Sequence, residues 1–282
     1  MTKVMPPPFT DGPARPRDAA TVVVMRDAAQ GPELYLVKRS REVDFMAGAH
    51  VFPGGRLDKA DSSAQACALL SAGTAALHAR LSEQVSPTHA AGLFVSAIRE
   101  TFEEAGLLFG RLATGWTTEE ARRALAGGAL FATLVEYLDA GALVPWVRWI
   151  TPVISPRRFD ARFFLAKAPA GQAPKVDGRE ATEGLWITPR DALERWQRGD
   201  MQLPPATARS IDALTMFRSV DEALDAAAMR APSVLMPVVW NSDGRAFISL
   251  PGDPHHPEPD TLGGSIFRIQ LEEGRYRPVP AA

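Results

Sequence analysis

Residues 99–106 read Arg-Glu-Thr-Phe-Glu-Glu-Ala-Gly, and this octapeptide constrains the fold more than any other part of the chain. At about 100° per residue around a helix axis, Glu103 lies at about −60° and Glu104 at about +40° from Glu100, so the three carboxylates share one face. Gly106 is suited to end the helix. The opposite face gathers apolar side chains, namely Phe94, Ile98, Phe102 and Ala105. The segment therefore predicts an amphipathic helix that packs on a core.

The glutamate stripe has two interpretations. One is an ordinary solvated helix face, because surface helices are rich in glutamate. The other is a cation site, since like charges three and four residues apart repel by roughly a few tenths of a kcal/mol. The upstream segment Phe52-Pro53-Gly54-Gly55 favours the second interpretation, because an apolar strand end followed by a proline and two glycines can turn sharply and approach a ligand. An ordinary hairpin turn is the alternative for the two glycines.

Together, the two segments resemble the Nudix box of the Nudix hydrolases. The box reads glycine, five residues, glutamate, seven residues and then R-E-U-x-E-E-x-G-U, where U is aliphatic or aromatic. Its second half is met by Arg99, Glu100, Glu103, Glu104, Gly106 and Leu107, with Thr101 in the first U position. The resemblance implies an α/β fold, specifically an α/β/α sandwich with a mixed β-sheet, and hydrolysis of a diphosphate linkage.

The first half of the box departs from the pattern. Gly55 and Arg99 are 44 positions apart, so about 30 residues are inserted. Asp61 stands at the glutamate position but is one methylene shorter, and we do not assign it that glutamate's role. The insertion, about 62–90, is rich in strong helix formers and has few acids, which predicts added helix that forms a lid or rim.

A split box resembles one branch of the family, the coenzyme A and acyl-CoA diphosphatases. Arg39-Ser40, Gly48 and 52–55 keep the spacing of that branch, whereas Asp44 stands where it has a second arginine. Because an aspartate cannot replace the phosphate contact of that arginine, other substrates remain as alternatives, namely ADP-ribose, NADH and dinucleoside polyphosphates. A Nudix-fold regulator that binds a nucleotide without turnover is a further alternative, but its expected mark is loss of the glutamates, and all three are present.

Diphosphate cleavage needs neutralised phosphate charge and an activated water. Carboxylate oxygens are hard ligands that favour Mg²⁺ or Mn²⁺, so we predict Glu100 and Glu104 as metal ligands. By resemblance, Glu103 shares the metal cluster or positions the water, and Arg99 orients the glutamates through charge-assisted hydrogen bonds. The resemblance also implies a general base in a later loop, where Glu180 and Glu183 are available. We predict Glu180 as that base, and the alternative for Glu180 is a solvated loop acid. The predicted substrate contacts are Arg39, Gly54, Gly55 and Arg162.

Composition excludes several classes of function. The formal net charge of −2 argues against a nucleic-acid polymer as partner, which favours a small nucleotide substrate. Cys67 is the sole cysteine, so the chain has no internal disulfide and is expected in a reducing compartment. The proline-rich segment 1–18 lacks the apolar core of a signal peptide, and no run is long enough to span a membrane. These features predict a cytoplasmic protein.

The pattern along the chain predicts three regions: a flexible tail over 1–18, a Nudix domain over 19–200 and a helical and β extension over 201–282. The expected strands are 20–26, 34–39, 49–52, 146–154, 162–166, 184–187, 234–240 and 246–250. The expected helices are 118–125, 130–139, 189–199, 206–216 and 220–229. The extension has two interpretations, a wrap around the main domain or a homodimer interface, and both stay open at this point.

Overall fold

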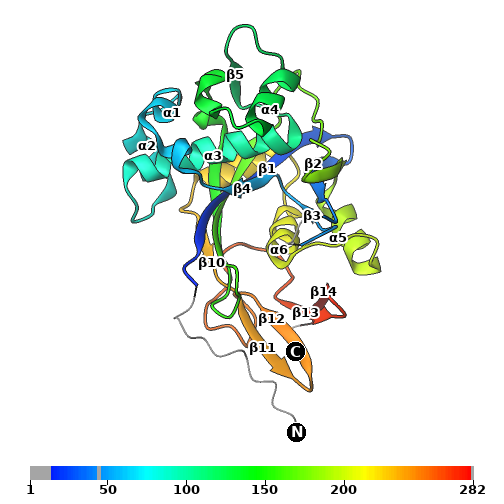
Figure 1. The fold of residues 1–282 in the computed structure, drawn as a ribbon. Coiled ribbons are helices and arrows are strands. Elements are labelled where there is room, and N and C mark those ends of the chain that lie inside the picture. The colour runs from blue at the N-terminus through cyan, green and yellow to red at the C-terminus, as the bar shows by residue number, and fades with distance from the viewer. Residues whose placement is uncertain (1–13, 43–45, 281–282) are drawn as a thin grey trace.

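The computed structural model describes residues 14–42 and 46–280. They form the three layers expected for an α/β/α sandwich, with helices on both faces of a mixed sheet (Figure 1). Asp44 and residues 1–13 of the predicted tail lie outside the described residues. The tail prediction is too long at its C-terminal end, because Arg17 and Asp18 already pair with Phe159 and Asp160 in the sheet.

The central sheet has the strand order β10-β7-β8-β1-β2-β3, with β4 paired to β1 and β9 paired to β2. β1 is long enough to serve two partners, β4 beside residues 19–21 and β2 beside residues 25–28. It runs parallel to β8 and antiparallel to both of these partners. The strands of this sheet are β1 (Arg17–Ala28), β2 (Gly31–Arg39), β3 (His50–Val51), β4 (Gly54–Arg56), β7 (Val144–Ile150), β8 (Phe159–Lys167), β9 (Ala181–Ile187) and β10 (Ser233–Leu235).

One face of the sheet is covered by α3 (Pro87–Ala105), the helix that carries the octapeptide. The Ser86 hydroxyl accepts from the His89 amide at its start, and Gly106 ends it with a left-handed φ of 69°. The predicted apolar face is confirmed, because it is fully buried against the sheet. Its members are Phe94, Ile98, Phe102 and Ala105.

The insertion forms helices packed beside α3, as predicted (Figure 1). These are α1 (Ala64–Ala68) and α2 (Thr74–Leu81), and the short helix η1 (Lys59–Ser62) leads into them. Leu77 and Leu81 of α2 are buried in the same core as α3, and the Arg80 guanidinium donates to the Ala140 carbonyl at 2.9 Å. The insertion is therefore a packed part of the domain.

A small unit follows α3 and packs on the same side of the sheet. It contains β5 (Gly110–Leu112), α4 (Thr118–Ala126), η2 (Phe131–Thr133), β6 (Val135–Leu138) and η3 (Ala140–Ala142). The predicted helix over 118–125 is confirmed as α4, which begins with a capping box between Thr117 and Glu120. The predicted helix over 130–139 is wrong, because Val135–Leu138 pairs with β5 instead and buries Val135 and Leu138, favoured by its β-branched and aromatic residues.

The other face of the sheet is covered by α5 (Pro189–Arg198), α6 (Pro205–Leu214) and α7 (Val220–Ala228). β10 then adds to the edge of the central sheet, parallel to β7. The final residues form a separate four-stranded sheet, β11 (Val238–Ser242), β12 (Arg245–Ser249), β13 (Arg268–Glu272) and β14 (Arg275–Val279). The sequence did not predict β13 and β14.

The region after residue 200 wraps the main domain, which was one of its two interpretations. Leu250 and Ile269 are buried in the same core as Trp196, and the Trp196 indole donates to the Tyr276 carbonyl at 2.7 Å. The homodimer stays a prediction. Within the described residues, no helix is both long and apolar enough to cross a membrane.

Candidate active site

The three glutamates of α3 differ in exposure although they share one helix face. Glu104 is 5% exposed, and the Glu100 side chain is 16% exposed. The Glu103 side chain remains 36% exposed. The stripe is therefore not an ordinary solvated surface, because the adjacent strand β4 lies against the carboxylates of Glu100 and Glu104.

Arg99 binds the acidic face from within the same helix. Its Nη1 atom donates to Oε1 of Glu100 and to Oε1 of Glu103, both at 2.9 Å. Burial opposes the charged guanidinium, but its acidic partners outweigh burial and raise the pKa of Arg99. Arg99 therefore binds two of the three carboxylates directly.

Asp61 has a role that the sequence analysis did not assign. Its side chain is 2% exposed and accepts from Arg99 through two parallel bonds of 2.9 Å, Nε to Oδ1 and Nη2 to Oδ2. Oδ2 also accepts from the Asp58 amide at 2.9 Å. The shorter side chain reaches Arg99 because η1 carries it against α3. Asp61 thus fixes Arg99, which in turn fixes the glutamates.

The two glycines of β4 lie against the acidic face, and each is required by a close contact. A Cβ on Gly55 would stand 2.3 Å from Cδ of Glu100, and a Cβ on Gly54 would stand 2.5 Å from the Ala20 carbonyl oxygen. The Gly54 amide donates to Oε2 of Glu104 at 3.0 Å. Both glycines form part of a β-strand paired with β1 in place of an isolated hairpin turn.

The electrostatics of this face favour a bound cation. Burial raises the pKa of Glu104 to about 8, and Glu100 adds to the effect. Burial also raises the pKa of Glu100 to about 7, although Arg99 opposes it. Two adjacent carboxyl groups that resist ionisation by themselves would be stabilised as carboxylates by a divalent cation.

The donor set fits Mg²⁺ or Mn²⁺ in its chemistry. Arg99 occupies Oε1 of Glu100 and Gly54 occupies Oε2 of Glu104, so each carboxylate keeps a second oxygen for a hard cation. Among the described residues, no three His, Cys, Asp or Glu side chains already converge closely enough to hold a metal ion. Ligation by all three glutamates would therefore require side-chain rotation.

Two further predicted residues lie at the same edge of the sheet. Arg39 ends β2, where it pairs with Ala181 of β9, and the Ser40 amide donates to the Glu180 carbonyl at 2.8 Å. The charge of Arg39 lowers the pKa of Glu104, whereas that of Glu180 raises it. The structure therefore brings Arg39, Glu180 and Glu104 into one electrostatic environment.

Arg162 does not join them. Its guanidinium is 4% exposed and donates to Glu83, with Nη2 to Oε2 at 2.6 Å, and to Asp18 and the Asp160 carbonyl. These buried bonds leave it unavailable for a phosphate, so we drop Arg162 from the site. The sequence analysis placed Arg162 among the substrate contacts because it could not indicate the acids, distant in sequence, that neutralise its charge.

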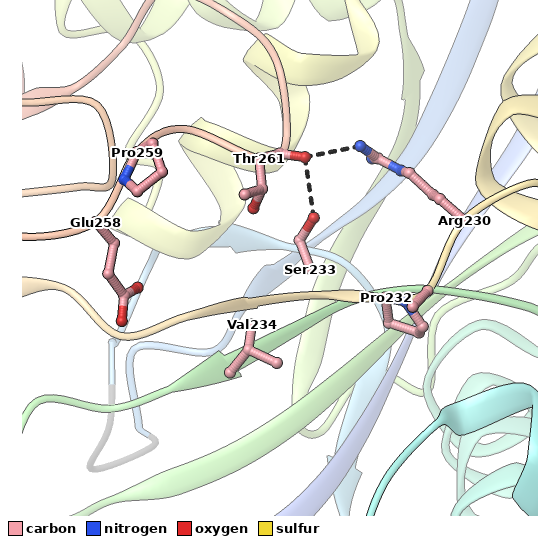
Figure 2. A pocket seen from close by; sticks show the side chains of 8 residues that line it. Arg230, Pro232, Ser233, Val234, Glu258, Pro259 and Thr261 are labelled. Atoms are coloured by element: carbon pink, nitrogen blue, oxygen red, sulfur yellow. Dashed lines mark hydrogen bonds between the residues drawn. The ribbon is translucent and has the colours of Figure 1, made fainter.

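A surface cavity of about 470 Å³ lies elsewhere, beside β10 and residues 258–261 (Figure 2). Two of its polar side chains are already bonded within the cavity wall, because Arg230 Nη1 and Ser233 Oγ both donate to the Thr261 carbonyl, at 2.7 and 3.0 Å. β10 is separated from β1 by β7 and β8. We place the chemistry at the acidic face, since this cavity offers no comparable set of ligands.

Comparison with known proteins agrees with this site. A family model described as the NUDT19 Nudix domain matches residues 87–214, a range that includes α3. The chain is 30% identical over 321 residues to the acyl-coenzyme A diphosphatase NUDT19 of Gallus gallus, a match that covers 91% of this chain and 84% of that protein. It is 27% identical over 278 residues to the protein of the same name from Xenopus laevis, covering 82% of this chain and 73% of the relative.

A solved structure supports the fold. The crystal structure of a Nudix hydrolase from Alicyclobacillus acidocaldarius superposes with a TM-score of 0.59 at 28% identity, covering 77% of this chain and 97% of that one. Sequence likeness over most of the chain, a matching fold and a split box whose helix carries all three glutamates agree with one another. The chain therefore belongs to the Nudix hydrolase family, in its NUDT19-type branch, and is a Nudix diphosphatase.

Proposed function

We propose that this diphosphatase cleaves coenzyme A or acyl-CoA, giving 3′,5′-ADP and phosphopantetheine or its acyl derivative. The observation that carries the proposal is the named activity of the relatives, acyl-coenzyme A diphosphatase, at 27–30% identity over most of the chain. The spacing of Arg39, Gly48 and the Gly54-Gly55 pair supports the same branch.

The site residues receive distinct roles in this proposal. Glu100, Glu103 and Glu104 hold Mg²⁺ or Mn²⁺, which when bound neutralises diphosphate charge and activates water. Arg99 keeps Glu100 and Glu103 in place through its 2.9 Å bonds. Arg39 and the backbone of Gly54 and Gly55 face the phosphates.

Glu180 is the proposed general base. Its side chain is exposed, so its carboxylate can accept a proton from the attacking water and release it to solvent. It immediately precedes β9, and its negative charge raises the pKa of Glu104. A second acid near α3 is useful because the α3 carboxylates are committed to Arg99 and to the metal.

Glu104→Gln tests the metal assignment. The change removes the charge while keeping the shape and an acceptor for the Gly54 amide, so we expect Mg²⁺-dependent hydrolysis to be abolished and the far-ultraviolet circular dichroism spectrum to stay unchanged. An unchanged rate would exclude Glu104 as a ligand.

A substrate panel tests the leaving group and the alternatives. Coenzyme A, acetyl-CoA, NADH, ADP-ribose and diadenosine polyphosphates are assayed with Mg²⁺ and with Mn²⁺, and the products are identified by mass. We expect the highest kcat/KM with coenzyme A or acetyl-CoA. A preference of more than about tenfold for another compound, worth about 1.4 kcal/mol, would replace the coenzyme A proposal. Absence of turnover on every compound would support a binding module.

A further inference from the structure

The segment between β8 and β9 forms hydrogen bonds with the backbone at the C-terminal end of α3 and just after it. The Gln172 side chain bonds both polar backbone groups of Leu108, accepting from its amide at 2.8 Å and donating to its carbonyl at 2.9 Å. The Lys175 amide donates to the Ala105 carbonyl at 2.8 Å. This segment leads directly to Glu180, so its attachment to α3 bears on the reaction.

Arg122 of α4 strengthens the same junction. Its Nε and Nη2 atoms donate to the Glu103 carbonyl at 3.1 and 2.6 Å, and its Nη1 donates to the Lys175 carbonyl at 2.8 Å. The guanidinium therefore ties the last turn of α3 to the incoming loop. Its positive charge also lies near Asp177, with which it interacts favourably.

Asp177 organises the turn that presents Glu180. Its Oδ1 accepts from the amides of Arg179 and Ala181 at 3.1 and 2.9 Å, and its Oδ2 accepts from the Glu180 amide at 3.1 Å. The Glu180 carbonyl accepts from the Ser40 amide, at the end of β2. The backbone of an exposed acid is thus held at both its amide and its carbonyl, although its side chain is free to meet a ligand.

We propose that Asp177 is a positioning residue, whose carboxylate holds the 178–181 turn so that Glu180 faces the acidic end of α3. The inference rests on the proposed function, in which Glu180 takes the proton of the attacking water. A base on an unrestrained loop spends little time in reach of that water, and small misplacements cost large factors in rate. Asp177 acts through the backbone of Glu180 and needs no contact with the substrate.

A double-mutant cycle on kcat separates the two assignments, using whichever substrate the panel identifies. Glu180→Gln alone reports on the base, and we expect kcat to fall by about 10²-fold. Asp177→Ala should lower kcat by at least about tenfold while KM stays within twofold, roughly, because substrate and metal contacts remain. In the Glu180→Gln background, Asp177→Ala should change kcat by less than about twofold.

Two further variants keep the test decisive. Asp177→Asn can keep the two bonds to Oδ1 and loses the acceptor for the Glu180 amide, so its kcat should fall between those of the wild type and Asp177→Ala. It carries the test if the alanine variant does not fold. Glu183→Gln is the matched control, because its 64% exposed carboxylate pairs with Lys38 instead, and its kcat should equal that of the wild type.

Each outcome assigns the failure to one idea. An equal loss from Asp177→Ala in both backgrounds would show that Asp177 acts independently of Glu180, which would overturn the inference while leaving the base in place. Wild-type kcat in both Asp177 variants would also overturn it. Wild-type kcat in Glu180→Gln would reject the proposed base, and the positioning role would then fall with it.

Discussion

Replacing Asp61 with alanine should destabilise the fold more than any loss of an exposed charge at the same site. Asp61 is 2% exposed and is bound to Arg99 by two bonds of 2.9 Å. The variant leaves a 9% exposed guanidinium side chain without its main partner. Removing one member of a buried ion pair costs about 3–5 kcal/mol, because the remaining charge stays desolvated.

The bond inventory gives a similar magnitude. Two hydrogen bonds to a charged group contribute roughly 1.5–3 kcal/mol each, and the Asp58 amide loses its acceptor as well. With a denaturant slope of about 3 kcal/mol per molar urea, a loss of about 3–5 kcal/mol lowers the urea midpoint by roughly 1–1.7 M. Hydrolysis should also fall, since Arg99 would no longer hold Glu100 and Glu103 in place.

Asp58→Ala is the matched control. The Asp58 carboxylate is 68% exposed and lies 3.9 Å from the same guanidinium, so its loss should cost less than about 1 kcal/mol. Urea unfolding followed by tryptophan fluorescence measures both variants against the wild type. Equal midpoints for Asp61→Ala and Asp58→Ala would refute the argument that burial and bidentate geometry make Asp61 the anchor.

Three further changes test the site and its surroundings. Gly55→Ala should keep the melting temperature but lower kcat by about 10²-fold, because its Cβ displaces the flexible carboxylate of Glu100; a wild-type kcat would contradict this. Gly54→Ala should instead lower the stability by roughly 1–3 kcal/mol, since its Cβ meets the backbone of β1, and an unchanged melting temperature would count against it. Burial lowers the pKa of His50 to about 4, so nuclear magnetic resonance should show its ring titrating there and not near its usual value. As the pH falls, His50 takes up its proton in the unfolded chain near pH 6.5 but in the folded chain only near pH 4. The free energy of unfolding should therefore decrease as the pH drops from about 6.5 to about 4, and His50→Gln should flatten that decrease.

Local signals in the sequence predicted much of the fold. The helices predicted over 118–125 and 189–199 match α4 and α5, whose N-terminal caps are Thr117 and Thr188, and Gly106 ends α3 as expected. Caps and terminal glycines act within one helical turn, so these ends can be predicted without distant segments. The helix predicted over 130–139 was wrong because local signals carry no information about pairing with another strand. The composition of this segment allows a helix, and pairing with β5 made part of it a strand.

For the site, the sequence by itself determined the acidic face of α3, its apolar opposite face and the family to which the chain belongs. These properties follow from helical periodicity and from a motif that is continuous over residues 99–106. Both are contained in a few turns of chain, and they need no information about distant segments.

Only the tertiary structure decided which charges belong together. Asp61 and Arg99 are 38 positions apart, and Arg162 and Glu83 are 79 apart, yet each pair is buried and in direct contact. One contact adds an anchor to the site, and the other removes a predicted phosphate ligand from it. The sequence could indicate neither, because the energy of a charge depends on the burial and partners that the folded chain supplies.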